Sequence, residues 1–153
     1  MQKDKICKQL SKYNTIYLEN NNIYRALTKS LGLSEGGFWI LYALRTDFIP
    51  PFQSEICSSM HHPKQTVNSA LKKLEADGYI TLLHDKDHRS KQICLTQKGI
   101  GLCEKTVDRV ISLEQDAFAS LAEEEQEQFL LLFDKYTNIL KEYTKRIIHN
   151  GKG

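Results

Sequence analysis

The sequence predicts a mainly α-helical protein whose centre is the stretch from Gln53 to Thr96. In this stretch a short apolar helix, a turn and a second helix ending at Gly78 precede two alternating strands that are joined by a charged loop. Long helical segments lie on both sides. The order helix, turn, helix and hairpin is typical of a winged helix-turn-helix with a two-stranded β wing. The long N- and C-terminal helices are then expected to form a dimerisation region.

Length and composition favour one domain. The chain has 153 residues, of which 41% are hydrophobic and 26% charged, as in soluble globular proteins that bury an apolar core. We expect a single domain at 1–153, with a winged helix-turn-helix lobe at 33–97 and helical dimerisation segments at 1–32 and 98–153. No apolar run reaches membrane-span length, and the N-terminus lacks the apolar block of a secretion signal. The sequence therefore predicts a cytoplasmic protein with no membrane partner.

Four cysteines are scattered over the helix and strand patterns without a CxxC spacing: Cys7, Cys57, Cys94 and Cys103. In a reducing compartment such residues are most simply buried small hydrophobes.

The first helix is expected at 5–31 and carries one long apolar face. That face consists of Ile6, Leu10, Tyr13, Tyr17, Tyr24, Leu27 and Leu31. A helix of this length extends about 39 Å, which is more than a small core can cover, so part of the face is expected to meet another chain. Asn20 to Asn22 are poor helix formers and predict a bend or a frayed region.

The next helix is expected from Ser34, its N-terminal cap, to Thr46. It is apolar on nearly all sides, as suits a central helix: Phe38, Trp39, Leu41, Tyr42 and Leu44. Gly36 and Gly37 in its first turn would allow another segment to pack closely.

The helix-turn-helix proper follows, with a short helix at 53–60 and a longer one from Pro63 to Asp77. Cys57 is small, which suits a point where two helices cross closely. The longer helix turns Val67, Ala70, Leu71 and Leu74 inward, and Gly78 closes it in the position after its C-cap.

The opposite face of this longer helix is polar and carries no acidic residue before Glu75. Its residues are Lys64, Gln65, Thr66, Asn68, Ser69, Lys72 and Lys73. Short hydrogen-bonding side chains in the first turns suit base edges in a major groove, and Lys72 and Lys73 suit phosphates. The net charge of +2 says little, since DNA binding needs a basic face and not a basic total. The alternative is an ordinary solvated helix face.

Two short strands are expected at 79–84 and 92–95, with a charged loop at 85–91. As a wing, this loop would place Arg89 in a minor groove, where a guanidinium is favoured. Asp87 would orient Arg89 through a charge-assisted hydrogen bond, and Lys91 would add a further DNA contact. The alternative is a solvated hairpin.

The C-terminal part is expected to contain a helix at about 97–120, capped by Thr96, and a last helix opened by the acidic run AEEEQEQ. The last helix carries a stripe close to a coiled-coil seam: Phe129, Leu132, Phe133, Tyr136, Leu140, Tyr143 and Ile147. Together with the first helix, it predicts an intertwined homodimer. A monomeric helical bundle is the alternative.

The helix order and the segments TVNSALKKLEADGYI and DKDHRSKQICLTQKG resemble the MarR family of bacterial transcription regulators. The most specific pieces are the D-x-R of the wing, Asp87 and Arg89, and the following Leu95–Thr96 and Gly99. The resemblance implies a homodimeric winged-helix protein on double-stranded DNA with a pseudo-palindromic operator. Such proteins usually repress, and a small ligand or an oxidant lowers their affinity for DNA.

The resemblance also implies roles for particular residues. Base-reading residues would fall on the outer face from Lys64 to Lys73, and the minor-groove arginine would be Arg89 with Asp87 as its acid. Gln53 or Ser54 would contact the DNA backbone. His61, His62 and Pro63 depart from the family's usual turn and are expected to be a local packing solution; a turn that is sensitive to pH is the alternative.

The resemblance further implies an effector site between the dimer helices and the winged lobe. A site for small aromatic or lipophilic ligands would be lined by Tyr13, Tyr17, Phe38, Trp39 and Tyr42. These aromatic residues also suit an ordinary core.

Other functions have weaker support in the sequence. Cys7, flanked by Lys5 and Lys8, is a candidate redox sensor. No metal site is predicted, because the histidines have no ligand spacing. Common catalytic and nucleotide-binding motifs are missing, so we expect no enzyme activity and no cofactor. A winged-helix protein-interaction module without DNA binding stays open.

Overall fold

The computed structural model describes residues 1–47, 49, 51–60, 62–84, 86–87 and 89–151. Their contacts divide the chain into two units, 1–111 and 112–153, and each unit is described by itself. The expectation about His61, and those for positions 85 and 88 of the charged loop, lie outside the described residues.

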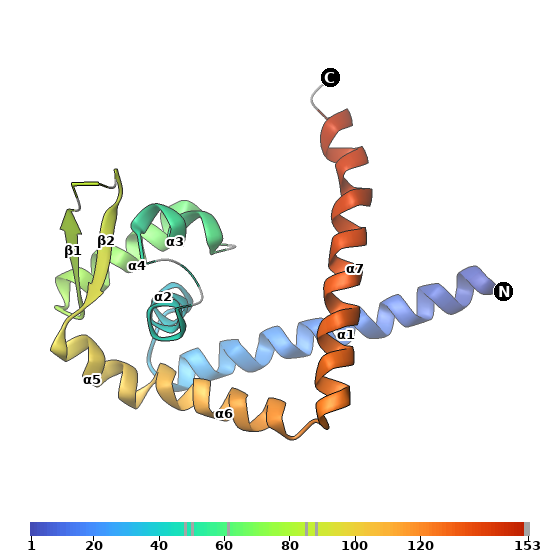
Figure 1. Cartoon of the computed structure of the whole chain (residues 1–153), viewed down its shortest axis with the longest axis horizontal. Coiled ribbons are helices and arrows are strands. Elements are labelled where there is room, and N and C mark those ends of the chain that lie inside the picture. The colour runs from blue at the N-terminus through green and yellow to red at the C-terminus, as the bar shows by residue number, and fades with distance from the viewer. Residues whose placement is uncertain (48, 50, 61, 85, 88, 152–153) are drawn as a thin grey trace. The chain divides into compact units, whose positions relative to one another are not determined.

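The helices and strands follow the predicted order and are labelled in Figure 1. They are α1 (Gln2–Ser30), α2 (Glu35–Thr46), α3 (Gln53–Ser59), α4 (Lys64–Ala76), β1 (Ile80–His84), β2 (Lys91–Leu95), α5 (Gln97–Lys105), α6 (Val107–Ala119) and α7 (Glu123–Asn150). The fold is the predicted mainly helical winged helix-turn-helix with long helices at both ends. No helix in the described part of the chain has the length and apolarity needed to cross a membrane.

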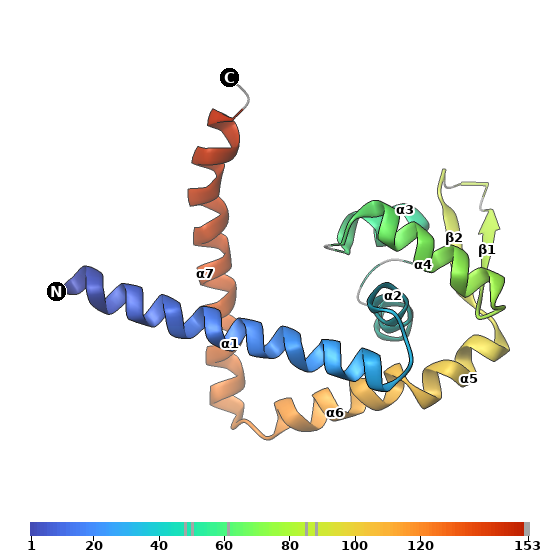
Figure 2. The ribbon, with the colours of Figure 1, turned by 180° about the vertical axis from the view of Figure 1, so that it is seen from behind.

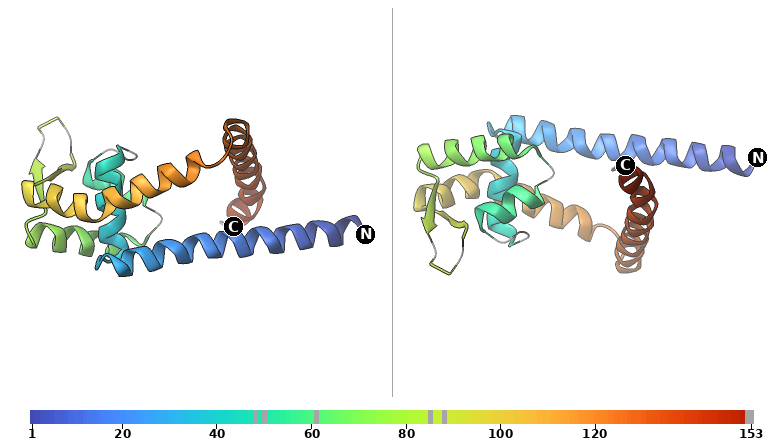
Figure 3. Two further views of the ribbon diagram at one scale, coloured as in Figure 1. Left: turned by 90° about the horizontal axis from the view of Figure 1, so that it is seen from below. Right: turned by 90° about the horizontal axis from the view of Figure 1, so that it is seen from above.

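The core of the first unit is organised around α2. This helix crosses between α1 and α4 on one side and α5 on the other (Figure 3). Phe38, Ile40 and Leu41 of α2 are fully buried, as the sequence predicted for a central helix. Burying each such side chain contributes about 1.5–3 kcal/mol relative to exposure, so packing around α2 contributes substantially to the stability of this unit.

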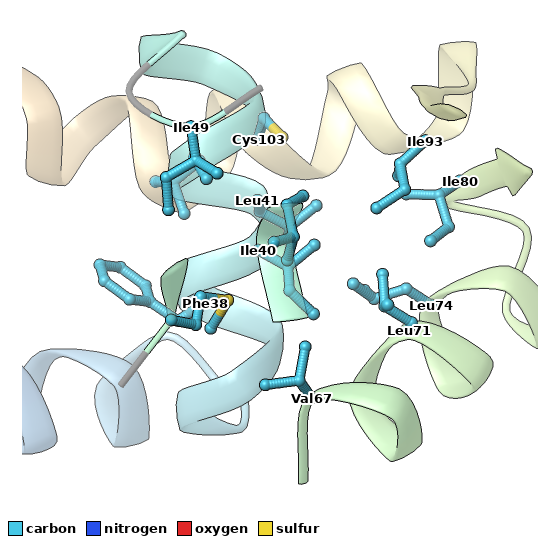
Figure 4. Close-up of a cluster of buried hydrophobic side chains, with 14 of the residues drawn as sticks. Phe38, Ile40, Leu41, Ile49, Val67, Leu71, Leu74, Ile80, Ile93 and Cys103 are labelled. Atoms are coloured by element: carbon cyan, nitrogen blue, oxygen red, sulfur yellow. The ribbon is translucent and has the colours of Figure 1, made fainter. Parts of the chain in front are cut away.

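Other elements supply much of the rest of this core. Figure 4 shows their side chains converging on α2: Val67, Leu71 and Leu74 from α4, Ile80 and Ile93 from the hairpin, and Cys103 from α5. Burial raises the pKa of the Cys103 thiol to about 11, so this side chain packs as a neutral small hydrophobe. The inward face predicted for the second helix of the helix-turn-helix is confirmed.

The expected helix ends are confirmed by hydrogen bonds. The backbone N–H of Gly37 donates to Ser34 Oγ, and that of Gly99 donates to Thr96 Oγ1, each at 3.0 Å. Gly78 follows α4 with a φ of +79°, a conformation that glycine adopts without strain. At the start of α7, Glu125 accepts a hydrogen bond from the backbone N–H of Ala122.

Two glycines mark close approaches between elements. A Cβ at Gly36 would lie 3.0 Å from Ala70 Cβ, so the missing side chain lets α2 pack directly on α4, as the sequence suggested. A Cβ at Gly99 would overlap the carbonyl oxygen of Tyr79 and press on Leu95. Gly99 therefore allows the start of α5 to sit against the residue that precedes β1.

The single helix expected at 97–120 is wrong, because the structure breaks it at Thr106. This residue leaves helical geometry with φ −126° and ψ −93°. Its hydroxyl donates to the carbonyl of Leu102 at 2.7 Å, the local bond by which threonine competes with the regular helix ladder. The chain continues as α6, whose Val107 and Val110 are buried.

Two further expectations are corrected. The helix α1 runs without interruption through Asn20 to Asn22, so the predicted bend or frayed region is absent from it. The four cysteines are not all buried, since only Cys103 is. Cys7 is exposed on α1 because the N-terminal half of that helix extends beyond the core of its unit.

The second unit consists of the end of α6 and α7. Phe129 contacts Phe118 and stacks on Phe133, with ring centroids 6.3 and 5.9 Å apart. Gln126 donates to the carbonyl of Leu121 and holds the turn between the helices. No described residue of α7 is buried within the chain, so its apolar stripe is available to another molecule.

The close approach at Gly99 gives a test of the fold. Gly99→Ala should lower the free energy of unfolding by about 1–3 kcal/mol, because a methyl group there collides with the Tyr79 backbone. Gly101→Ala in the same helix is the control, since nothing lies within 4 Å of its Cβ position. It should leave stability unchanged or raise it by up to about 1 kcal/mol. Urea unfolding measures both, and equal stability of the two variants would contradict this packing.

Candidate nucleic-acid interface

The exposed face of α4 is the candidate surface for DNA. Successive residues of a helix turn by about 100°, so Gln65 and Ser69 lie opposite the buried Val67, with Lys72 and Lys73 on either side of them. All four are exposed. The predicted base-reading and phosphate-binding groups therefore share one outward face.

Two predicted DNA contacts lie at the flanks of this face. Thr66 is exposed, but its methyl group lies beside Gly36 on the α2 side. Asn68 is half-buried on the other flank, where its Oδ1 accepts a hydrogen bond from the thiol of Cys57 in α3 at 3.3 Å. Lys64 lies in the first turn and is exposed.

The start of α3 is tied to the wing. Ser54 donates its backbone N–H to Ser90 Oγ at 2.9 Å and its hydroxyl to Glu55 Oε2 at 2.8 Å. Both donors of Ser54 are thus engaged within the protein. Gln53 is half-buried at the first position of α3, and its role as a backbone contact stays a prediction.

The wing itself is an antiparallel hairpin in which Ile80 pairs with Leu95 and His84 with Lys91. The segment before α3 adds to its edge, because the N–H of Ile93 donates to the carbonyl of Pro51 at 2.7 Å. The hairpin and the start of α3 consequently form one hydrogen-bonded assembly.

The predicted wing residues Asp87, Arg89 and Lys91 are all exposed, as is Lys86. The pairing of Asp87 with Arg89 and the minor-groove role of Arg89 stay predictions. The hairpin lies beside α3 and α4, as a wing lies beside a recognition helix (Figure 1).

The C-terminal end of α4 is fastened to α5. Thr96 donates its hydroxyl to the carbonyl of Gly78, and Lys98 donates to the carbonyl of Asp77, both at 2.6 Å. The Lys98 ammonium also lies 4.7 Å from the centre of the Tyr79 ring. These contacts satisfy helix-end carbonyls and fix the direction in which α4 presents its polar face.

Comparisons with known proteins agree with this geometry. Residues 31–90 match the model of the MarR family. An uncharacterised HTH-type transcriptional regulator of Bacillus subtilis, YwoH, is 30% identical over 102 residues, which cover 67% of this chain and 74% of that protein. The chain belongs to the MarR family. It is accordingly a DNA-binding transcriptional regulator, of a family that is regulatory and not enzymatic.

Solved structures share the fold. NMB1585, a MarR family regulator from Neisseria meningitidis, superimposes with a TM-score of 0.76 at 20% identity, covering 90% of this chain and 97% of that one. The MepR–DNA complex of S. aureus superimposes with a TM-score of 0.64 at 25% identity, covering 84% and 93%.

A cavity of about 440 Å³ lies in the first unit of this MarR-family chain. It is lined by Tyr17, Asn21, Tyr24, Arg25 and Thr28 of α1, by Glu35, Trp39, Tyr42 and Ala43 of α2, and by Ile49, Ser59, Met60 and His62. Trp39 lies 5.2 Å from the Tyr24 ring and 5.3 Å from the Tyr42 ring between centroids. The cavity thus joins an aromatic wall to the turn of the helix-turn-helix.

Of the five aromatic residues proposed for an effector site, three line the cavity and two do not. Tyr17, Trp39 and Tyr42 line the cavity. Phe38 is fully buried in the core, and Tyr13 stacks on Tyr17 but does not line the cavity.

Other groups at this cavity were not identified from the sequence. Arg25 and Glu35 form an ion pair at 3.5 Å, and His62 reaches the cavity from the turn. These residues come from three separate segments, so no local sequence pattern could have grouped them.

Among the described residues, no further group supports the two other sensor types, a redox sensor at Cys7 and a metal sensor. Cys7 is exposed on α1. Within the described ranges no three His, Cys, Asp or Glu side chains come together as a metal site.

The paired lysines of α4 should determine part of the salt dependence of DNA binding. Replacing Lys72 and Lys73 by alanine should reduce the slope of log affinity against log salt by about two for each chain on the DNA, since each lost phosphate contact removes roughly 0.9. Lys135 and Lys141, exposed on α7, provide a control variant with the same loss of charge. Binding isotherms over a range of salt measure the slope, and equal slopes for the two variants would rule out these contacts.

Arg89 should contribute to affinity through the wing. Arg89→Ala is expected to cost about 1–3 kcal/mol of operator binding, the range for a side chain that contacts bases, with the fold unchanged. Arg109→Ala removes the same charge from an exposed position on α6 and should have little effect. A gel-shift titration compares them, and parental affinity of Arg89→Ala would refute the wing assignment.

Proposed function

We propose that this protein is a repressor that binds a pseudo-palindromic operator as a homodimer and leaves it when a small aromatic or lipophilic effector binds. The observation that carries the proposal is the cavity, because its wall contains both α1 and α2 aromatics and the turn between α3 and α4. A single ligand would contact the interior of the lobe and the segment that leads into the recognition helix.

The polar face of α4 supports the mode of DNA binding. In a winged helix-turn-helix this helix enters the major groove, and dimers place two copies about 34–36 Å apart on successive turns. Gln65 and Ser69 would then face base edges, Lys72 and Lys73 phosphates, and Arg89 the adjacent minor groove. MepR, which is 25% identical to this chain, has been solved in complex with DNA.

Exposed apolar side chains support the homodimer. On α1 they include Ile16, Leu18 and Ile23, with 54–60% of their surface exposed. On α7 they include Phe129, Leu132 and Leu140. Exposed apolar side chains in this number on two long helices are costly in water, and association of two chains would bury part of them.

The effector would act through the turn. Met60 is buried, and His62 donates its backbone N–H to the carbonyl of Met60 at 2.7 Å, immediately before α4. A ligand that displaces either residue moves the start of α4. Because the end of α4 is fastened to α5, such a movement would tilt the recognition helix and change its fit to the groove.

The effector site can be tested with a fluorescent probe. The chain has a single tryptophan, Trp39, so binding of anilinonaphthalene sulfonate in the cavity should quench its emission by energy transfer. Ser59→Phe should weaken dye binding by about tenfold, since a phenyl ring occupies part of the space that the apolar dye would fill. Ser58→Phe is the control, because Ser58 is exposed and does not line the cavity.

The same titration on DNA tests the rest of the proposal. A labelled operator duplex should become saturated at two bound chains, and addition of the dye should release the protein from the duplex. Saturation at one chain, or dye binding that leaves operator affinity unchanged, would refute the dimer or the effector mechanism respectively.

A further inference from the structure

A thiol of α3 contacts the recognition helix. Cys57 Sγ lies 3.3 Å from Asn68 Oδ1, and both side chains are half-buried where α3 and α4 lie side by side (Figure 2). In the part of the chain that the structure describes, this is the only side-chain hydrogen bond between the two helices. The hydrogen bond from Cys57 of α3 therefore fixes the orientation of the Asn68 carboxamide.

The thiol acts as the donor in this contact. Burial raises the pKa of Cys57, and the nearby Lys64 lowers it by a smaller amount. The thiol consequently stays protonated at neutral pH, and a neutral S–H donates while the carbonyl oxygen of an amide accepts.

This contact limits what Asn68 can offer to DNA. An asparagine reads adenine with both ends of its amide, accepting from N6 and donating to N7. Here Oδ1 is turned toward Cys57, and Nδ2 has no partner among the described residues. The end that remains is a donor, which matches the acceptors of guanine (O6 and N7), thymine (O4) and adenine (N7), whereas cytosine presents only its N4 donor.

We propose that Cys57 is a positioning residue for sequence specificity. It orients Asn68 as a hydrogen-bond donor, so that this side chain favours bases with a major-groove acceptor and disfavours cytosine at one position of each half-site. The inference rests on the proposed function, since α4 must lie in the major groove for Asn68 to reach a base.

Selection from a pool of randomised duplexes tests this with the full-length protein. The parent should deplete cytosine at the position whose preference disappears in Asn68→Ala. Cys57→Ala frees the amide to turn and should reduce the discrimination against cytosine at that position alone, by about three- to tenfold, the range of one hydrogen bond. Cys57→Ser keeps a donor of similar size and should restore the parental preference.

The base preference at this position distinguishes a positioning role of Cys57 from a purely structural packing role. A purely structural role would lower affinity for all sequences equally and leave base preferences unchanged, so an unchanged profile for Cys57→Ala overturns the inference. A uniform loss of affinity in Asn68→Ala also overturns it, because it places Asn68 on a phosphate. If the parent enriches no sequence at all, the proposed operator binding fails as well, which is a distinct result.

Discussion

Burial of α2 is the constraint on which the rest of the winged lobe depends. Phe38, Ile40 and Leu41 make this helix apolar around most of its circumference, so it is stable only when other elements enclose it. α1, α4 and α5 each pack on it. Because α4 contributes Val67, Leu71 and Leu74 to the same core, its orientation is fixed by packing, and its polar residues are left to face outward.

Much of this organisation could be predicted from the sequence because it follows local rules. The periodicity of Val67, Leu71 and Leu74 identifies the buried face of α4, and the polar face follows from it. Ser34 and Thr96 mark helix starts through hydrogen bonds to residues three positions later. These signals depend only on neighbours in the chain, so no knowledge of the fold was needed to read them.

Other features depend on contacts between distant segments, which no local pattern encodes. The break at Thr106 was missed because its apolar neighbours continue a helical period, whereas its hydroxyl competes for the Leu102 carbonyl. The cavity collects Arg25, Trp39 and His62 from three segments. The bond between Cys57 and Asn68 spans eleven positions; the sequence suggested only that a small residue would suit this crossing.

The hydrogen bonds between the wing and α3 have a consequence for the DNA that this protein accepts. Ser54 with Ser90, at the end of the loop, and Pro51 with Ile93, in the middle of β2, tie the hairpin to the start of the helix-turn-helix. The loop that carries Arg89 is therefore not free to change its reach independently of α4. If Arg89 enters the minor groove as proposed, a duplex whose minor groove is too wide or too narrow at that distance must deform to fit, and the energy of deformation depends on its sequence. Base pairs that no side chain touches would then contribute to the choice of binding site.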